Sequence, residues 1–238
     1  MTKTLSLQDL VVERGGKTVV HGLSMEFHPG EITALIGANG AGKSSTVMAL
    51  SGAIPVKAGR ILWRGQDITN RPVDRNRREG LALVPEGHPV LGALSVIDNL
   101  RAACSHLPVS EVAGAVDRAL ALFPELTARL SVPAAALSGG QKQMVLMGQA
   151  IAASPRFMLI DELSLGLAPA VVSRLADTLR QLADEGIGIV LIEQFTTIAL
   201  RLAKRAYVLE RGRIAFAGAS EELRNDPSIL HSAYLAAS

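Results

Sequence analysis

Apolar and polar residues alternate along the first thirty positions of the chain. Leu23, Met25 and Phe27 are apolar, whereas Ser24 and Glu26 between them are polar. This period of two is typical of a strand with one buried face. We therefore predict antiparallel strands over the first thirty residues.

Short, unbroken apolar runs recur further along the chain. They occupy residues 32–36, 157–160 and 187–192, and weaker strand patterns cover 60–64 and 81–84. Unbroken apolar runs are typical of strands that are buried on both faces of a parallel sheet. Because helical patterns separate these runs, the order of elements predicts an α/β fold.

The middle of the chain has helical patterns instead of strand patterns. Residues 95–103 and 110–123 each begin with a serine, a residue favoured at helix N-caps. We therefore predict a helical insert over residues 87–155, within an α/β core formed by residues 1–86 and 156–238.

A glycine-rich loop follows the apolar run at 32–36. Its sequence fits the phosphate-binding pattern G-x-x-x-x-G-K-[ST] and reads Gly37-Ala38-Asn39-Gly40-Ala41-Gly42-Lys43-Ser44. Backbone N–H groups of such a loop, with the start of the next helix at Ser45, attract phosphate oxygens. Lys43 adds a full positive charge, and the Ser44 hydroxyl is a ligand for Mg²⁺. We predict that this loop binds a nucleoside triphosphate.

A pair of carboxylates, Asp161-Glu162, follows the apolar run at 157–160. Ligands of α/β sheets bind at the carboxyl ends of the strands, so we expect this pair beside the phosphate loop. Asp161 is then a predicted Mg²⁺ ligand. Glu162 is the predicted general base that polarises the attacking water.

A second glycine-containing segment, Leu137-Ser138-Gly139-Gly140-Gln141, opens a helical pattern. Its serine and glycine N–H groups crowd the positive end of that helix and form a second anion site. This LSGGQ segment resembles the signature of ABC ATPases, and the phosphate loop, signature and Asp-Glu pair occur in that family's order. The resemblance implies a P-loop NTPase with a RecA-like, mainly parallel sheet, an N-terminal antiparallel β subdomain and an inserted helical subdomain.

The resemblance also implies how the protein works. Two such domains are expected to pair head to tail around ATP and Mg²⁺, so that each signature completes the ATP site of the other domain. Ser138, Gly139, Gly140 and Gln141 of one domain would then contact a nucleotide held by Lys43 of the other. Lys43 is also a predicted catalytic residue, because its positive charge would neutralise the phosphates.

Finer features resemble one branch of the family. Glu86, in Val84-Pro85-Glu86-Gly87, occupies the place of a Gln that senses Mg²⁺, and is an implied Mg²⁺ ligand. Gln194, after Glu193, occupies the place of a switch His and is an implied catalytic residue. With SLGLAP at 164–169 and SAYL at 232–235, these segments resemble ATP-binding subunits of branched-chain amino-acid uptake systems of the LivF type.

The chain departs from that pattern at three places. Leu163 replaces a Pro and Phe195 replaces an Asn, and no aromatic residue occupies the N-terminal segment where the family stacks adenine. Arg14 in that segment either stacks on the base through its guanidinium plane or lies in a solvated turn. We predict weak base selectivity. Because Gln194 cannot take up a proton or a positive charge as His can, we also predict slow intrinsic hydrolysis that depends on partners.

Composition limits where the protein works. The net charge of +2 is too small to indicate a nucleic-acid partner, and the single cysteine, Cys104, forms no intrachain disulfide. The sequence has neither a secretory signal pattern nor about 18 consecutive apolar residues. We expect a cytosolic protein held at the cytoplasmic face of the membrane by other proteins.

The resemblance implies those partners. They are a second ATP-binding subunit (homologous or identical), two transmembrane permease subunits docked near residues 86–106 and, indirectly, an extracytoplasmic solute-binding protein. The solute would be a branched-chain amino acid or, alternatively, another amino acid, an amide or urea. Two other functions stay open: a soluble ABC ATPase that acts on nucleic acid or the ribosome, and a regulatory subunit with weak turnover.

Overall fold

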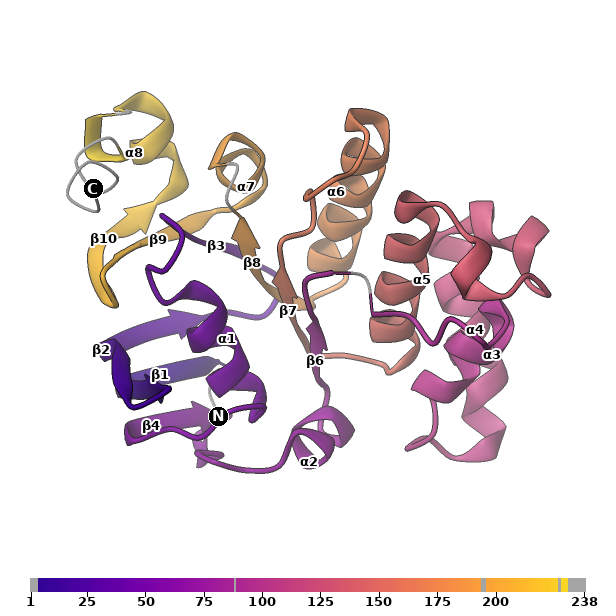
Figure 1. Cartoon of the computed structure of the whole chain (residues 1–238), viewed down its shortest axis with the longest axis horizontal. Helices are drawn as coiled ribbons and strands as arrows, with labels where there is room; N and C mark the ends of the chain where they lie inside the picture. The colour runs from indigo at the N-terminus through magenta and orange to yellow at the C-terminus, as the bar shows by residue number, and fades with distance from the viewer. Residues whose placement is uncertain (1–3, 88, 194–195, 227, 231–238) are drawn as a thin grey trace.

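A computed structural model describes residues 4–87, 89–193, 196–226 and 228–230. Within these ranges the chain forms two sheets and two groups of helices (Figure 1). The smaller sheet has the strand order β2-β1-β4-β5, and the larger has the order β10-β9-β3-β8-β7-β6.

The smaller sheet is antiparallel, as the alternation in the sequence predicts. Leu23, Met25 and Phe27 are all less than 5 % exposed, whereas Ser24 and Glu26 face solvent. The strands are β1 (Leu5–Arg14), β2 (Lys17–Phe27), β4 (Ala58–Trp63) and β5 (Gln66–Asp67).

The larger sheet is mainly parallel, which confirms the predicted fold class. Only β10, at one edge of its described strands, runs antiparallel to its neighbour. The strands are β3 (Ile32–Gly37), β6 (Leu81–Val84), β7 (Phe157–Asp161), β8 (Gly188–Glu193), β9 (Arg205–Glu210) and β10 (Arg213–Ala219). The sequence analysis did not assign β9 and β10.

The central strands are buried on both faces. In β3, Leu35 packs towards α1 and the smaller sheet, whereas Ile36 packs towards the helices on the opposite face, and both are fully buried. Burial of each such side chain stabilises the fold by about 1.5–3 kcal/mol. The run at 32–36 is therefore apolar throughout because β3 is buried on both faces of the sheet, as the sequence predicts.

The helices fall into two groups (Figure 1). Those that flank the strands are α1 (Lys43–Ser51), α2 (Val73–Arg78), α6 (Pro169–Asp184), α7 (Thr196–Leu202) and α8 (Ser220–Asn225). Those gathered beyond β6 and α6 are α3 (Val96–Ala103), α4 (Val109–Leu122), α5 (Gly139–Ala152) and the 3₁₀ turns η1 (Pro124–Arg129) and η2 (Ala134–Ala136).

One of the two serine caps predicted for this second group is wrong. Ser95 caps α3, because its hydroxyl accepts the Asp98 N–H. Ser110, by contrast, lies inside α4, which begins at Val109 after Pro108. Proline suits this position because its fixed φ favours the entry into a helix and it has no N–H that needs a partner.

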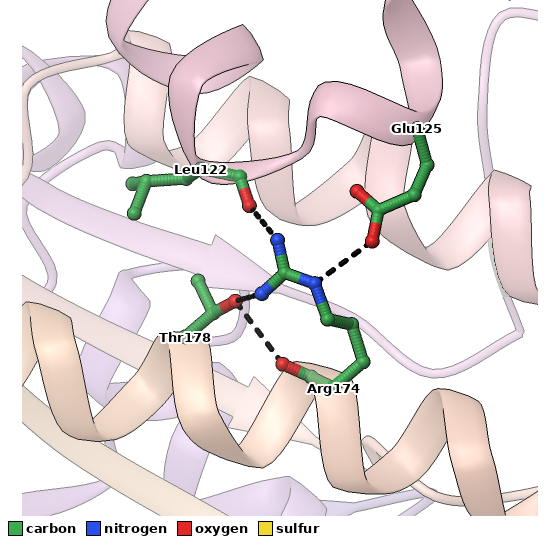
Figure 2. Close-up of polar contacts among 4 residues, drawn as sticks. All are labelled: Leu122, Glu125, Arg174 and Thr178. Carbon is green, nitrogen blue, oxygen red and sulfur yellow. Dashed lines mark hydrogen bonds and ion pairs between the residues drawn. The ribbon is translucent and has the colours of Figure 1, made fainter.

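Arg174 on α6 ties this helix to the end of α4 (Figure 2). Its guanidinium donates hydrogen bonds to Glu125 Oε1 at 2.8 Å, to Thr178 Oγ1 at 2.9 Å and to the Leu122 carbonyl. It also lies over the Phe123 ring, 5.6 Å from the centroid. Because the guanidinium is planar and has five donors, it joins several groups at once.

Candidate functional site

The glycine-rich loop links β3 to α1 and packs against neighbouring backbone. Gly42 precedes α1 in the left-handed region, with φ of 100°. A Cβ atom at Gly42 would lie 2.8 Å from the Val19 carbonyl oxygen, and one at Gly37 would lie 2.3 Å from that of Leu209. Only glycine fits these two positions.

Lys43 begins α1 and folds back over the loop. Its Nζ donates to the carbonyl oxygens of Gly37 at 2.8 Å and Ala38 at 3.0 Å, and the residue is only 5 % exposed. Burial lowers the pKa of Lys43, while the nearby Glu162 and Asp161 oppose this shift. A buried cation thus stands at the start of a helix, where phosphate groups bind well.

Asp161 ends β7 and lies next to the first turn of α1. The Ser44 hydroxyl donates to Asp161 Oδ1 at 3.3 Å. Burial raises the pKa of Asp161, the charge of Glu86 adds to the rise, and the hydrogen bond from Ser44 opposes it. The structure therefore brings together the three residues predicted to bind Mg²⁺: Ser44, Glu86 and Asp161.

Glu162 follows in a left-handed conformation, with φ of 51°. This conformation is uncommon for residues other than glycine and often occurs at functional sites. Its N–H donates to the Ile192 carbonyl at 3.0 Å. Burial raises the pKa of Glu162, and the charges of Glu86 and Asp161 raise it further.

These oxygen donors fit Mg²⁺ only in part. Throughout the ranges that the structure describes, no group of three His, Cys, Asp or Glu side chains is arranged to hold a metal ion. Mg²⁺ is usually held by one or two carboxylates together with substrate phosphates and water. The residues present therefore fit an ion that binds together with a nucleotide.

A cavity of about 590 Å³ lies over the phosphate loop. Its volume is within the usual range for small-molecule sites, about 300–1,000 Å³. It is lined by Arg14, Val19, Asn39, Gly40, Gly42, Lys43, Ser44, Ser45, Met48, Glu86, Glu162 and Leu165. Gly37, Ala38 and Ala41 of the predicted loop do not line it; the N–H of Ala41 donates to the Ala38 carbonyl at 3.1 Å.

Three lining residues were missed by the sequence analysis. Met48 lies four residues after Ser44 on α1, so helical spacing places both on one face and would have indicated it. Val19 and Leu165 come from distant elements, and no local pattern points to them. Arg14 lines the cavity as well, and its Nη1 lies 3.4 Å from the Met48 sulfur.

The signature segment lies away from this cavity. α5 stands on the far side of β6 and β7 from α1 (Figure 1). Ser138 caps α5, because its hydroxyl accepts the Gln141 N–H at 3.3 Å and the Gln141 side chain accepts the Ser138 N–H at 3.1 Å. The N–H groups of Gly139 and Gly140 have no partner among the described residues. The tip of α5 thus presents two free donors at a positive helix end.

Gln194, the predicted switch residue, lies outside the described residues, as do Phe195 and the segment 232–235. Its neighbour Glu193, at the end of β8, is described and is 1 % exposed. Glu193 accepts hydrogen bonds from the Ser164 N–H at 3.1 Å and the Ser164 hydroxyl at 2.7 Å. Burial raises the pKa of Glu193 to about 7.

The groups of this site suit phosphoryl transfer. They combine a buried lysine, a serine beside a carboxylate, and a second carboxylate at the cavity wall. In the part of the chain that the structure covers, no helix is long and apolar enough to cross a membrane.

Comparisons with known proteins agree with this chemistry. The family described as ABC transporter matches residues 20–164. The chain is 38 % identical to the high-affinity branched-chain amino acid transport ATP-binding protein BraG of Pseudomonas aeruginosa, over 97 % of this chain and 99 % of BraG. It is 32 % identical to the lipopolysaccharide export system ATP-binding protein LptB of Acidithiobacillus ferridurans, over 96 % of this chain and 95 % of LptB.

A solved structure of an ATP-binding subunit of an ABC transporter has the same fold. It superposes with a TM-score of 0.84 at 28 % identity, over 98 % of each chain. ABC ATPase subunits work with transmembrane permease subunits in transporters. The matched family, the two relatives and the fold together show that the chain belongs to the ABC transporter ATP-binding family. Members of this family bind and hydrolyse ATP.

Proposed function

We propose that the chain powers a transporter that takes up branched-chain amino acids. One observation supports this most: the chain has a phosphate-loop cavity on one side of β6 and β7 and an exposed helix tip with two free N–H donors on the other. A nucleotide in the cavity lacks the contact that the tip of a second subunit would supply. ATP would therefore join two subunits, and hydrolysis would release them.

Five residues would divide the chemistry at each site. Lys43 would neutralise the phosphates, Ser44, Glu86 and Asp161 would hold Mg²⁺, and Glu162 would polarise the attacking water. When bound, Mg²⁺ supplies positive charge that stabilises the reacting phosphate oxygens. The raised pKa of Glu162 suits a general base, because it brings the carboxylate closer to the working pH.

Other residues complete the nucleotide site. Arg14, Val19 and Met48 line the same cavity as the phosphate loop and would receive the base. Gln194 would donate a hydrogen bond to the terminal phosphate. The remaining contacts would come from residues 138–141 of the second subunit.

A second, largely apolar cavity of about 370 Å³ would receive the permease. It opens between β6 and the helices α3 and α5, and Leu91 at its edge is 50 % exposed. Its apolar lining includes Val73, Leu83, Pro85, Pro89, Leu91, Leu146 and Ala150. An amphipathic cytoplasmic helix of a permease subunit fits such a groove. We propose that the helical subdomain, residues 87–155, moves with that helix relative to the core at 1–86 and 156–238.

The complete machine would contain two ATP-binding subunits, which are homologous or identical, and two permease subunits at the cytoplasmic face of the membrane. An extracytoplasmic solute-binding protein would deliver the solute. The identity to BraG favours branched-chain amino acids, whereas the identity to LptB makes lipopolysaccharide export the second candidate.

Transport into vesicles tests this proposal. Vesicles that contain the chain, its permease subunits and its solute-binding protein should accumulate labelled leucine, isoleucine or valine only when ATP is supplied. The same vesicles carrying Lys43→Ala should not. ATP-dependent turnover without any amino-acid accumulation would contradict the assigned solute but leave the ATPase assignment intact.

A further inference from the structure

A buried pair of hydrogen bonds joins β8 to the segment that follows Glu162. Both carboxyl oxygens of Glu193 accept from Ser164, one from its N–H at 3.1 Å and the other from its hydroxyl at 2.7 Å. The two residues are 1 % and 7 % exposed. Two hydrogen bonds between the same two residues fix position and orientation together, more closely than one contact does.

Ser164 in turn anchors the loop formed by residues 163–168, which we call the 163–168 loop. Its carbonyl accepts the Leu167 N–H at 3.2 Å, which closes a tight turn. Leu165, within that turn, lines the ATP cavity beside Glu162. Leu167 approaches the tip of α5, because a Cβ atom at Gly139 would lie 3.8 Å from Leu167 Cδ2. The loop therefore runs from the hydrolysing carboxylate to the signature tip of the same chain.

We propose that Glu193 is a positioning residue, which holds the 163–168 loop through Ser164 and thereby fixes Glu162 relative to the tip of α5. This inference rests on the proposed function, in which Glu162 serves the chain's own ATP and the tip of α5 serves the ATP of the second subunit. Glu193 would then link the two ATP sites of the dimer mechanically. It acts through Ser164, since it does not line the ATP cavity.

The geometry of the pair does not depend on a charge at Glu193. An ionised carboxylate accepts both hydrogen bonds. A protonated carboxyl keeps one oxygen as acceptor for the N–H and donates its proton to the Ser164 oxygen. A glutamine makes the same two contacts through its oxygen and its amide nitrogen. Glu193→Gln should therefore preserve the positioning of the loop, whereas Glu193→Ala removes it.

ATP hydrolysis by a small set of variants tests the proposal. We compare Glu193→Ala, Glu193→Gln, Ser164→Ala and the double variant Glu193→Ala/Ser164→Ala. Asn76→Ala is the matched control, because Asn76 is also 1 % exposed and holds a backbone carbonyl, that of Ser51, away from the loop. For each variant we measure kcat, KM for ATP, fluorescent-nucleotide binding and Tm.

The proposal predicts a loss in kcat and not in binding. Glu193→Ala should lower kcat about 10-fold or more with KM within about twofold, since small misplacements of reacting groups cost up to about 100-fold. Glu193→Gln should restore most of kcat, and Ser164→Ala should give an intermediate loss. The double variant should be no slower than Glu193→Ala. If Glu193→Ala does not fold, the kcat values of Ser164→Ala and Glu193→Gln still test the proposal. The proposal then predicts a lower kcat for Ser164→Ala than for Glu193→Gln.

Two results would overturn the proposal while wild-type protein hydrolyses ATP. One is a kcat at the wild-type level in both Glu193→Ala and Ser164→Ala. The other is an equal loss of kcat in Asn76→Ala at a similar loss of Tm, because a purely structural role then explains the effect. Wild-type protein that neither binds nor hydrolyses ATP would instead overturn the proposed function, and this inference with it.

Discussion

The Ser44 hydroxyl lies 3.3 Å from Asp161 Oδ1, although 117 residues separate the two in sequence. The contact joins the first turn of α1 to the end of β7 and places a hydroxyl and a carboxylate where they share one ligand. Together with Lys43 it defines the part of the cavity where the terminal phosphates and Mg²⁺ would bind.

Removal of the Asp161 charge should weaken Mg²⁺ binding. Asp161→Asn keeps the shape of the side chain, so we expect the Mg²⁺ concentration for half-maximal ATPase activity to rise about 10-fold or more. A Mg²⁺ titration of the ATPase rate measures this. The control is Asp177→Asn, an exposed carboxylate paired with Arg180. An unchanged titration for Asp161→Asn would remove Asp161 from the metal site.

Glu162→Gln should block hydrolysis without preventing ATP binding. We expect kcat to fall about 100-fold or more, the usual contribution of general-base catalysis. Size-exclusion chromatography should then show an ATP-dependent dimer. Glu185→Gln, at an exposed carboxylate paired with Arg118, should behave as wild type. An unchanged ATPase rate in Glu162→Gln would favour the regulatory subunit over the motor.

Because of Glu193, the free energy of unfolding should fall as the pH rises. Its pKa is raised from an ordinary value near 4.5 to about 7 in the folded protein. The folded state thus holds the proton more tightly, and this stabilising contribution is complete below about pH 4.5 and lost as the pH rises through 7. The loss is on the order of 3 kcal/mol. Urea unfolding from pH 5 to 8 should show a steeper fall for wild type than for Glu193→Gln; parallel curves would contradict the raised pKa.

Arg174 should contribute measurably to stability. Arg174→Ala removes three hydrogen bonds and the contact with Phe123, and should lower the free energy of unfolding by about 2 kcal/mol. Arg174→Lys should recover little, because an ammonium group cannot copy the planar fork. Denaturant unfolding measures both variants. A Lys variant as stable as wild type would show that charge alone holds the junction.

Base selectivity should be weak. In the cavity wall formed by Arg14, Val19 and Met48, the one polar side chain is that of Arg14, and it is exposed to solvent. Strong discrimination requires buried polar groups that the wrong ligand leaves unpaired. We therefore expect Kd values for ATP and GTP to differ less than about tenfold in a fluorescence titration. A larger preference for ATP would point to a base contact outside this wall.

Local patterns were enough to predict the larger part of the fold. The strands β3, β7 and β8 have distinctive apolar runs, and the phosphate loop and the Asp-Glu pair follow two of them directly. The order of strands in the sheet, with β9 beside β3, depends on long-range pairing that no local pattern encodes. The wrong cap at Ser110 has a local cause, since the preceding proline already starts the helix.

The candidate site was predicted less completely than the fold. Residues with chemical motifs, such as Lys43 and Glu162, could be identified from sequence because their spacing is fixed. Leu165 and Val19 could not, because tertiary packing alone brings them to the cavity. The same holds for the contact of Glu193 with Ser164, which lies 29 residues earlier in the chain.

The central claim is that ATP is shared between the phosphate loop of one subunit and the α5 tip of another. Mixing two inactive variants tests it directly. Lys43→Ala inactivates the phosphate loop and leaves the α5 tip intact, whereas Ser138→Arg inactivates the α5 tip and leaves the phosphate loop intact. Mixed dimers would have one intact composite site, so an equal mixture should recover about a quarter of the wild-type ATPase rate. A mixture as inactive as either variant alone, beside active wild-type protein, would contradict the shared site.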